Sequence, residues 1–294
     1  MTSITDYVKE GLKYPFNDGK KVLTLGVIFL ISSLVSFLMS YFIFDSIRLI
    51  ENNTTLGTVN ALFSAIPQNN MGIIVLSWII SFILLLFASG YLYDIIKYSI
   101  EGRKELPEFS DIKGIFLKGI RTFIVGIAYA IVPFLLFILG VMLSANENVG
   151  AAVNSIGAII LFISIIVTIF VALIEIMALS NMIAHDELSA AFRFKEILAL
   201  VKNIGWGKYI GVLIFAFIVV VVLSVFLRFI ASMICFGLAA LLGSALVLAL
   251  SSLILNSLFI NSYLSVVFGR IFGSIYREAI NGEEKGEGEI DIGE

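Results

Sequence analysis

Cysteine and histidine are almost absent from this 294-residue sequence, which contains one of each, Cys235 and His185. A single cysteine forms no internal disulfide, and a single histidine builds no cluster for zinc or non-haem iron. Charged residues are also scarce, at 14% of the chain, against roughly 25% in a soluble domain. These shortages argue against a metal centre and exclude a water-soluble fold.

Proline is rare as well, with four residues, and no Gly/Ser-rich run marks a long flexible linker. The net charge of -3 offers no basic footprint for nucleic acid. The sequence contains no phosphate-binding loop, catalytic triad or paired carboxylates. We therefore predict no catalytic, cofactor-binding or metal-binding residues, and no enzymatic activity.

Apolar residues, in contrast, make up 60% of the chain. Stretches with at most one charge, each long enough to cross about 30 Å of hydrocarbon, cover residues 22–44, 72–93, 123–143, 156–178 and 209–227. The first stretch is too long for the core of a signal peptide, so we expect it to remain as an anchor. The pattern predicts an all-α, polytopic transmembrane helical bundle.

The number of crossings depends on the uncharged run 229–268, which has 40 residues, about twice the length that one span needs. We favour an outer turn near residues 235–237, a sixth span over about 240–262 and an interfacial helix after it. Two spans in this run, giving seven crossings, are the alternative. Six crossings with the amino terminus inside place 17 of the 19 cations on inner segments, leaving only Arg48 and Arg228 outside.

This charge bias predicts a multi-pass protein of the plasma membrane with both termini in the cytoplasm. Eight of the ten tyrosines fall near the same inner boundary, where amphipathic rings favour the level of the lipid headgroups. They are Tyr7, Tyr14, Tyr91, Tyr93, Tyr98, Tyr209, Tyr263 and Tyr276. The expected partners are the lipid bilayer, including anionic lipids, and proteins at the cytoplasmic face.

Short amphipathic segments with basic flanks precede the odd-numbered spans, as expected of interfacial helices. They cover residues 4–12, after a Ser3-x-x-Asp6 capping pattern, then 109–120, and finally 188–201, which Gly205 closes. The six spans are thus interpreted as three parallel repeats of an interfacial helix plus a transmembrane hairpin.

We therefore predict a single transmembrane domain over residues 1–280. Its repeat units cover about 1–106, 107–186 and 187–280. A disordered acidic tail follows at 281–294.

Glu175 is the one acidic residue inside a predicted span, and such a carboxylate is a candidate proton or cation relay. Its position near the inner end favours a simple pairing with Arg121 or Lys208. Arg228 is expected to snorkel to the outer surface. The side chains of Asn256 and Asn261 are expected to hold helices together.

Two loop motifs complete the candidate sites. Pro107, Glu108 and Phe109 form a turn that we consider as a partner-binding site, although a proline there also simply starts the next helix. Asn52 and Asn53 are overlapping glycosylation acceptors in the predicted outer loop.

Three short motifs carry a resemblance to a known family: Tyr14-Pro15-Phe16, Gly90-Tyr91, and Glu101-Gly102 followed by Leu106-Pro107-Glu108-Phe109. In these residues the chain resembles the domain of unknown function 4013 family, from about Tyr7 to about Tyr276. The resemblance implies a polytopic membrane protein, of a mostly archaeal family, without an assigned activity. It supplies no catalytic residue.

Two functions remain open at this point. The first is a non-catalytic membrane protein that organises the inner leaflet or docks partners through its basic interfacial helices. The alternative is a transporter or channel for a small or amphiphilic solute, against which the spans offer few polar residues to line a path.

Overall fold

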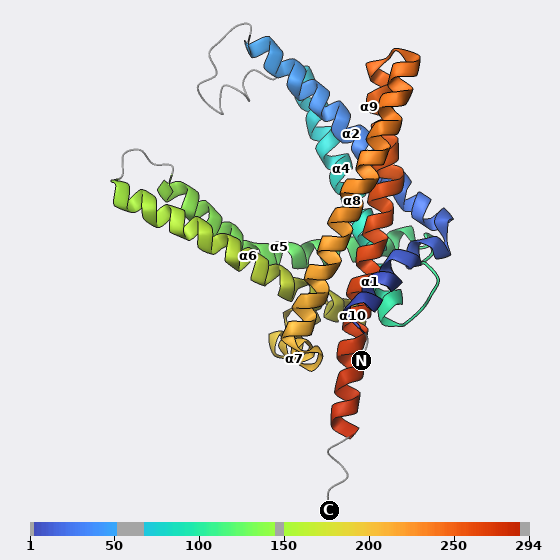
Figure 1. Ribbon diagram of the computed structural model, residues 1–294. Helices are drawn as coiled ribbons and strands as arrows, with labels where there is room; N and C mark the ends of the chain where they lie inside the picture. Colours follow the sequence, from blue (N-terminus) through green and yellow to red (C-terminus); the bar gives the residue numbers. More distant parts are fainter. Residues whose placement is uncertain (1–2, 52–67, 145–149, 289–294) are drawn as a thin grey trace, which may run out of the picture.

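The computed structural model describes residues 3–51, 68–144 and 150–288, and every regular element in these ranges is helical. Three helical hairpins diverge from a common base (Figure 1). The first consists of α2 (Gly19–Glu51) and α4 (Gln68–Ile100), and the second of α5 (Ile112–Ser144) and α6 (Ala151–His185). In the third, α8 (Trp206–Leu242) returns through α9 (Ala245–Ile254), the π-helical η3 (Leu255–Asn261) and α10 (Ser262–Gly288).

Short helices lead into the first and third hairpins. They are α1 (Ile4–Lys13) with η1 (Tyr14–Asn17), and η2 (Leu188–Phe192) with α7 (Phe194–Ile204). The predicted capping of α1 is confirmed, because the Ser3 backbone N–H donates to Asp6 Oδ2 at 3.2 Å. The predicted end of α7 is also confirmed, since Gly205 follows it with a positive φ of 90°, a conformation that favours glycine.

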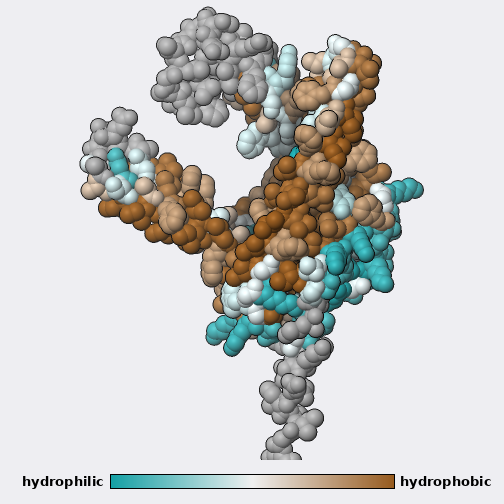
Figure 2. Space-filling model, viewed as in Figure 1, coloured by the Kyte–Doolittle hydropathy of each residue, from teal (hydrophilic) through white to brown (hydrophobic). Residues whose placement is uncertain are grey.

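Six helical segments are long and apolar enough to cross a membrane, which confirms the all-α polytopic bundle with six crossings. Apolar residues cover the hairpins, whereas hydrophilic residues gather at the base (Figure 2). Because that apolar surface would be unstable in water, the chain is a multi-pass membrane protein.

The turn of the third hairpin corrects the predicted one. It lies at Gly243 and Ser244 and not at residues 235–237, which are helical. Gly243 takes a left-handed conformation with φ 59°, and the Ser244 N–H bonds back to the Ala239 carbonyl oxygen at 3.2 Å. This is the hydrogen bond of a glycine-terminated helix end, whereas Gly237 lies inside α8.

Two predicted interfacial helices are corrected as well. The amphipathic segment 109–120 is not a separate helix, because α5 begins at Ile112 and continues to Ser144. The interfacial helix that we predicted after residue 262 is not a separate helix either. It is part of α10, which runs to Gly288, into the segment that we predicted to be a disordered tail. Residues 289–294 lie outside the described part. The division into three repeat units stays a prediction.

Helix α10 is central to the base and contacts α1, α2, α4, α6, α7 and α8. Glycines allow the closest helix crossings around it. A Cβ on Gly26 of α2 would lie 2.2 Å from the Leu258 carbonyl oxygen, and one on Gly273 of α10 would lie 2.6 Å from that of Ile96. The hairpins are therefore in tight backbone contact near the base and spread apart beyond it (Figure 1).

Candidate functional site

The base is held together by a buried cation of α10. Arg270 is 3% exposed, and its guanidinium donates to Oε1 of Glu10 in α1 at 2.5 and 3.0 Å. It also donates to the Arg103 carbonyl oxygen at 2.6 Å and lies 4.5 Å from the centre of the Tyr14 ring. Because an enclosed charge is stable only when it is paired, Arg270 fixes α1, η1 and the loop after α4 against α10.

The motifs that carry the family resemblance meet beside this cation. The Tyr14 hydroxyl donates to the Glu105 carbonyl oxygen at 2.7 Å, and the Tyr91 hydroxyl donates to that of Pro107 at 3.1 Å. Phe109 stacks on Tyr91 with the ring centres 3.8 Å apart. Burial raises the pKa of Tyr14 to about 12, so its hydroxyl remains a donor at neutral pH.

Lys21 of α2 completes this arrangement. Its ammonium group lies 2.6 Å from Glu108 Oε1 and donates to the Leu106 carbonyl oxygen at 2.8 Å. Pro107, Glu108 and Phe109, the predicted partner-binding turn, therefore all have contacts within the chain. Binding of a partner by this turn stays a prediction.

A second polar cluster joins the end of α6 to its neighbours. Arg121 of α5 pairs with Asp186 at 2.7 Å, and the Tyr93 hydroxyl donates to the same carboxylate at 3.0 Å. Asn181 is fully buried, accepts from the Tyr276 hydroxyl at 2.5 Å and donates to the Ala190 carbonyl oxygen at 3.0 Å. Helices α4, α5, α6, η2 and α10 are thus connected by hydrogen bonds near the base.

The tyrosines differ from the sequence-based expectation in their surroundings. Six that we expected at the headgroup level are at most 2% exposed, with their rings packed between helices: Tyr7, Tyr14, Tyr91, Tyr93, Tyr209 and Tyr276. Their hydroxyls bond to carbonyl, carboxylate or amide oxygens of other segments, as Tyr209 does to the Leu173 carbonyl oxygen. Buried hydroxyls need such acceptors, so these residues hold the hairpins together.

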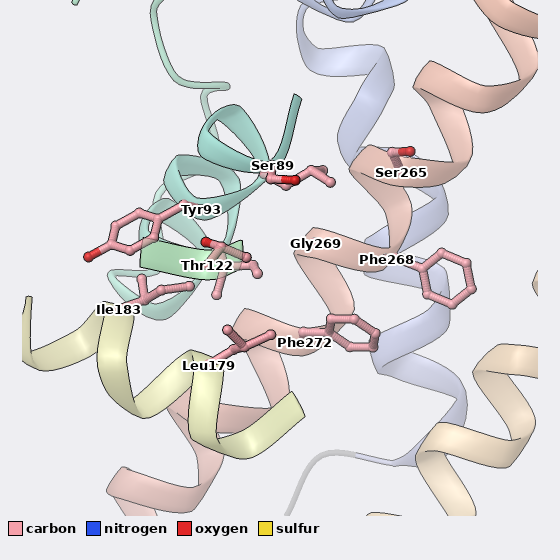
Figure 3. Close-up of a pocket in the computed structure, with 11 residues that line it drawn as sticks. Ser89, Tyr93, Thr122, Leu179, Ile183, Ser265, Phe268, Gly269 and Phe272 are labelled. Atoms are coloured by element: carbon pink, nitrogen blue, oxygen red, sulfur yellow. The ribbon is translucent and has the colours of Figure 1, made fainter. Parts of the chain in front are cut away.

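An apolar cavity of about 360 Å³ lies where the three hairpins converge. Figure 3 shows its lining, which comes from α4, α5, α6 and α10. The lining is apolar except for a few hydroxyl groups, and its labelled residues are Ser89, Tyr93, Thr122, Leu179, Ile183, Ser265, Phe268, Gly269 and Phe272. Such a space suits a hydrocarbon chain and offers little to a polar solute.

A larger apolar groove of about 540 Å³ lies between the first and third hairpins. Leu23 of α2 forms one side, Leu223 and Leu227 of α8 another, and Phe259 of η3 a third. Phe16, 77% exposed, lies at the base of the groove and packs against Tyr263 with ring centres 5.6 Å apart. The volume is within the range of about 300–1,000 Å³ that is usual for ligand sites.

Glu175 does not have the partners that we expected. Arg121 pairs with Asp186, and Lys208 pairs with Glu278 at 2.5 Å. Glu175 itself is half-buried, with Oε1 3.6 Å from where a Cβ on Gly126 would lie. It forms no hydrogen bond or ion pair with the residues that the structure describes. An ion-coupling role for it stays a prediction.

Arg228 is the largest departure from the predicted arrangement. It does not lie at the outer end of a span, because α8 continues for 14 residues beyond it to Leu242. Its guanidinium donates to Asn256 Oδ1 at 2.9 Å, to Asn261 Oδ1 at 2.8 Å and to the Ser224 hydroxyl at 3.1 Å. The two asparagines do hold helices together, as predicted, but by binding a cation.

Sequence reasoning therefore did not identify the Arg228 cluster. One signal was present: residues 229–254 contain no charge, so apolar sequence continues well beyond the arginine. The predicted glycosylation acceptors Asn52 and Asn53 lie outside the described residues. No group of three or more potential metal-ligating side chains is found in the described ranges.

The fold and these clusters define a class, an α-helical polytopic membrane protein with three hairpins joined by polar contacts at one end. The chain belongs to a family of proteins of unknown function (DUF4013), whose pattern it matches over residues 73–232. Gly90-Tyr91 and Leu106–Phe109 lie within that match, whereas Tyr14-Pro15-Phe16 precedes it.

A relative is the uncharacterized protein MJ1189 of Methanocaldococcus jannaschii. It is 29% identical over 232 residues, which cover 76% of this chain and 77% of the relative. No solved structure matches the chain.

Proposed function

We propose that this protein is a non-catalytic membrane protein that binds lipid between its hairpins and so organises the inner leaflet. The observation that carries the proposal is the apolar character of its two large cavities, about 360 and 540 Å³, at the places where hairpins meet. Burying hydrocarbon there removes apolar surface from contact with any water at the base. A polar solute would find few hydrogen-bonding partners in either cavity.

The short helix α7 supports a position at the membrane surface. Its buried side packs through Ile197, Leu200 and Val201, yet Phe194 and Leu198 remain exposed, at 52% and 40%. Exposed apolar side chains beside lysines are typical of helices that lie in the interface. The exposed side of α7 thus fits the level of lipid headgroups.

The orientation of the protein is part of the proposal, because cations concentrate at the base of the hairpins. We expect both termini in the cytoplasm. Single cysteines at Lys104 and Lys202, in a background with Cys235 replaced by serine, should be protected from impermeant thiol reagents in intact cells. A cysteine at Asn60 should be labelled. Labelling at Lys104 and Lys202 with protection at Asn60 would show that the protein has the opposite orientation.

Filling the central cavity should displace lipid. We expect Ser265→Leu to reduce the lipid that co-purifies with the protein, because the new side chain occupies the space that Figure 3 shows. Native mass spectrometry of protein extracted in mild detergent measures the bound lipid directly. Ser36→Leu is the matched control, since Ser36 is exposed on α2 and lines neither cavity. Equal lipid content in both variants and the unchanged protein would contradict lipid binding in this cavity.

Glu175, which has no partner among the residues that the structure describes, favours the alternative, an ion-coupled transporter. We expect Glu175→Gln to fold and to retain the same lipid as the unchanged protein in the mass spectra. The same preparations, reconstituted in liposomes, should show no proton-driven flux with either side chain. A flux that the unchanged protein supports and the glutamine variant loses would overturn this preference.

A further inference from the structure

The guanidinium of Arg228 has no counter-charge within the described part of the chain. Its three bonded acceptors are the neutral side-chain oxygens of Ser224, Asn256 and Asn261. No salt bridge among the described residues includes it. A guanidinium has five N–H donors, so two remain for another acceptor, and the side chain is exposed on the surface of the protein.

The length of α8 places this charge at the depth of the hydrocarbon. Arg228 lies 22 residues after Trp206, about 33 Å along the helix, and 14 more residues, about 21 Å, follow it. If Arg228 were at the outer surface, the uncharged segment 229–254 would stand in water. Its side chains include Phe229, 62% exposed, and Leu241, 83% exposed. Such exposure is unfavourable, so we expect α8 to tilt and Arg228 to lie within the membrane.

The π-helical geometry of η3 arranges the two amide acceptors. Residues five apart in an α-helix point about 140° away from each other, whereas the i to i+5 hydrogen bonding of a π-helix brings them close to one face. Asn256 and Asn261 are five apart, and both accept from the same guanidinium. Single π-turns of this kind are frequent at functional sites.

The apolar groove is lined by residues that are neighbours of this cation and its acceptors in the chain. Leu227, next to Arg228 in α8, lines the groove, and so do Leu258 and Phe259, which lie between the two asparagines. An unneutralised cation within the membrane is costly unless an anion accompanies it. A cation beside a groove of about 540 Å³ complements a molecule that has an anionic group and a hydrocarbon chain.

From these observations we infer that Arg228, held by Asn256 and Asn261, binds the phosphate group of an anionic lipid whose chain occupies the adjacent groove. This inference rests on the lipid binding of the proposed function, though not on the inner leaflet as its site, and names the lipid class. The guanidinium uses its two remaining N–H donors for the phosphate oxygens, because Arg–phosphate pairs are commonly bidentate. The asparagines are positioning residues, which hold the cation without neutralising it.

Competition between two lipids tests the inference. The full-length protein in detergent receives equal amounts of phosphatidylglycerol and phosphatidylcholine with identical chains, and native mass spectrometry reports the ratio of bound lipids. We expect a preference for phosphatidylglycerol, and Arg228→Gln should reduce it about tenfold, the effect of losing one charge-assisted contact.

A second variant retains the arginine. Asn256→Asp places a carboxylate where an acceptor now lies 2.9 Å from the guanidinium, so it should neutralise the cation and also reduce the preference about tenfold. Asn203→Asp, at an exposed position on α7, makes the same change in net charge and should leave the ratio within twofold.

The outcomes separate this inference from the proposed function. If both lipids bind, but neither Arg228→Gln nor Asn256→Asp changes their ratio, the Arg228 site is refuted and lipid binding stands. If neither lipid binds to the unchanged protein, both proposals fail. A last measurement adds inorganic phosphate at the same concentration as phosphatidylglycerol. If phosphate alone displaces the lipid, the site binds a free anion, which overturns the lipid assignment.

Discussion

Replacing Arg270 by methionine is expected to destabilise the protein by about 3 kcal/mol, the lower end of the cost of breaking a buried ion pair. The lower end applies because the partner left behind, Glu10, has a side chain that is 36% exposed. Its carboxylate can therefore regain water when the enclosed Arg270 is removed. The substitution also leaves the Arg103 carbonyl oxygen without its 2.6 Å donor. Unfolding by sodium dodecyl sulfate in mixed micelles measures the change in the free energy of unfolding.

Arg103→Gln is the control for this measurement. The side chain of Arg103 pairs with Glu101 at 2.7 Å, but the two side chains are 46% and 34% exposed. A surface pair of this kind contributes at most about 1 kcal/mol. Equal effects of Arg270→Met and Arg103→Gln would show that the Arg270 network does not hold the base together.

Gly90→Leu is expected to have a still larger effect, above about 3 kcal/mol, since overpacking alone costs up to about that much. A Cβ on Gly90 of α4 would lie 1.7 Å from the Ile115 carbonyl oxygen of α5, and one on Gly119 of α5 would lie 1.9 Å from that of Leu86. Backbone atoms cannot rotate away as side chains do, so the helices would have to separate. Loss of folded protein in size-exclusion chromatography and thermal unfolding would report the change.

Gly72→Ala in the same helix is the matched control. Among the residues that the structure describes, no atom outside its own helix lies within 4 Å of a Cβ at that position. Alanine favours a helix by up to about 1 kcal/mol over glycine, so this variant should be as stable as the unchanged protein or slightly more stable. If Gly90→Leu behaved in the same way, the close crossing of α4 and α5 would be contradicted.

Features that depend on neighbours in the sequence were predictable. The capping of α1 by Ser3 and Asp6 and the end of α7 at Gly205 follow from local hydrogen bonds and from the freedom of glycine to take positive φ. The six crossings follow from the spacing of charges, because hydrocarbon requires long uncharged helices. The continuity of α5 and α10 was missed, since an amphipathic segment and a span have the same helical periodicity and can join without a break.

The candidate site was less predictable, because it consists of contacts between distant segments. Glu175 was expected to pair with Arg121 or Lys208, yet Arg121 reaches Asp186 and Lys208 reaches Glu278. The sequence was compatible with a pair between Arg121 and either Glu175 or Asp186. Only the relative positions of α5 and α6 along their axes decide that Asp186 is the partner. The same holds for the buried tyrosines, whose position near the inner boundary is equally suited to lipid headgroups or to neighbouring helices.

The sequence by itself determined that the chain is a helical membrane protein and favoured six crossings over seven, because hydrophobic length and charge spacing act along the chain. Only the tertiary structure decided which polar groups meet. It brings Asn256 and Asn261 to Arg228, and Glu10 to Arg270, across 28, 33 and 260 residues. The reason is physical: in an apolar surrounding each polar group requires a partner, but helix crossings, and not sequence distance, determine which partner is within reach.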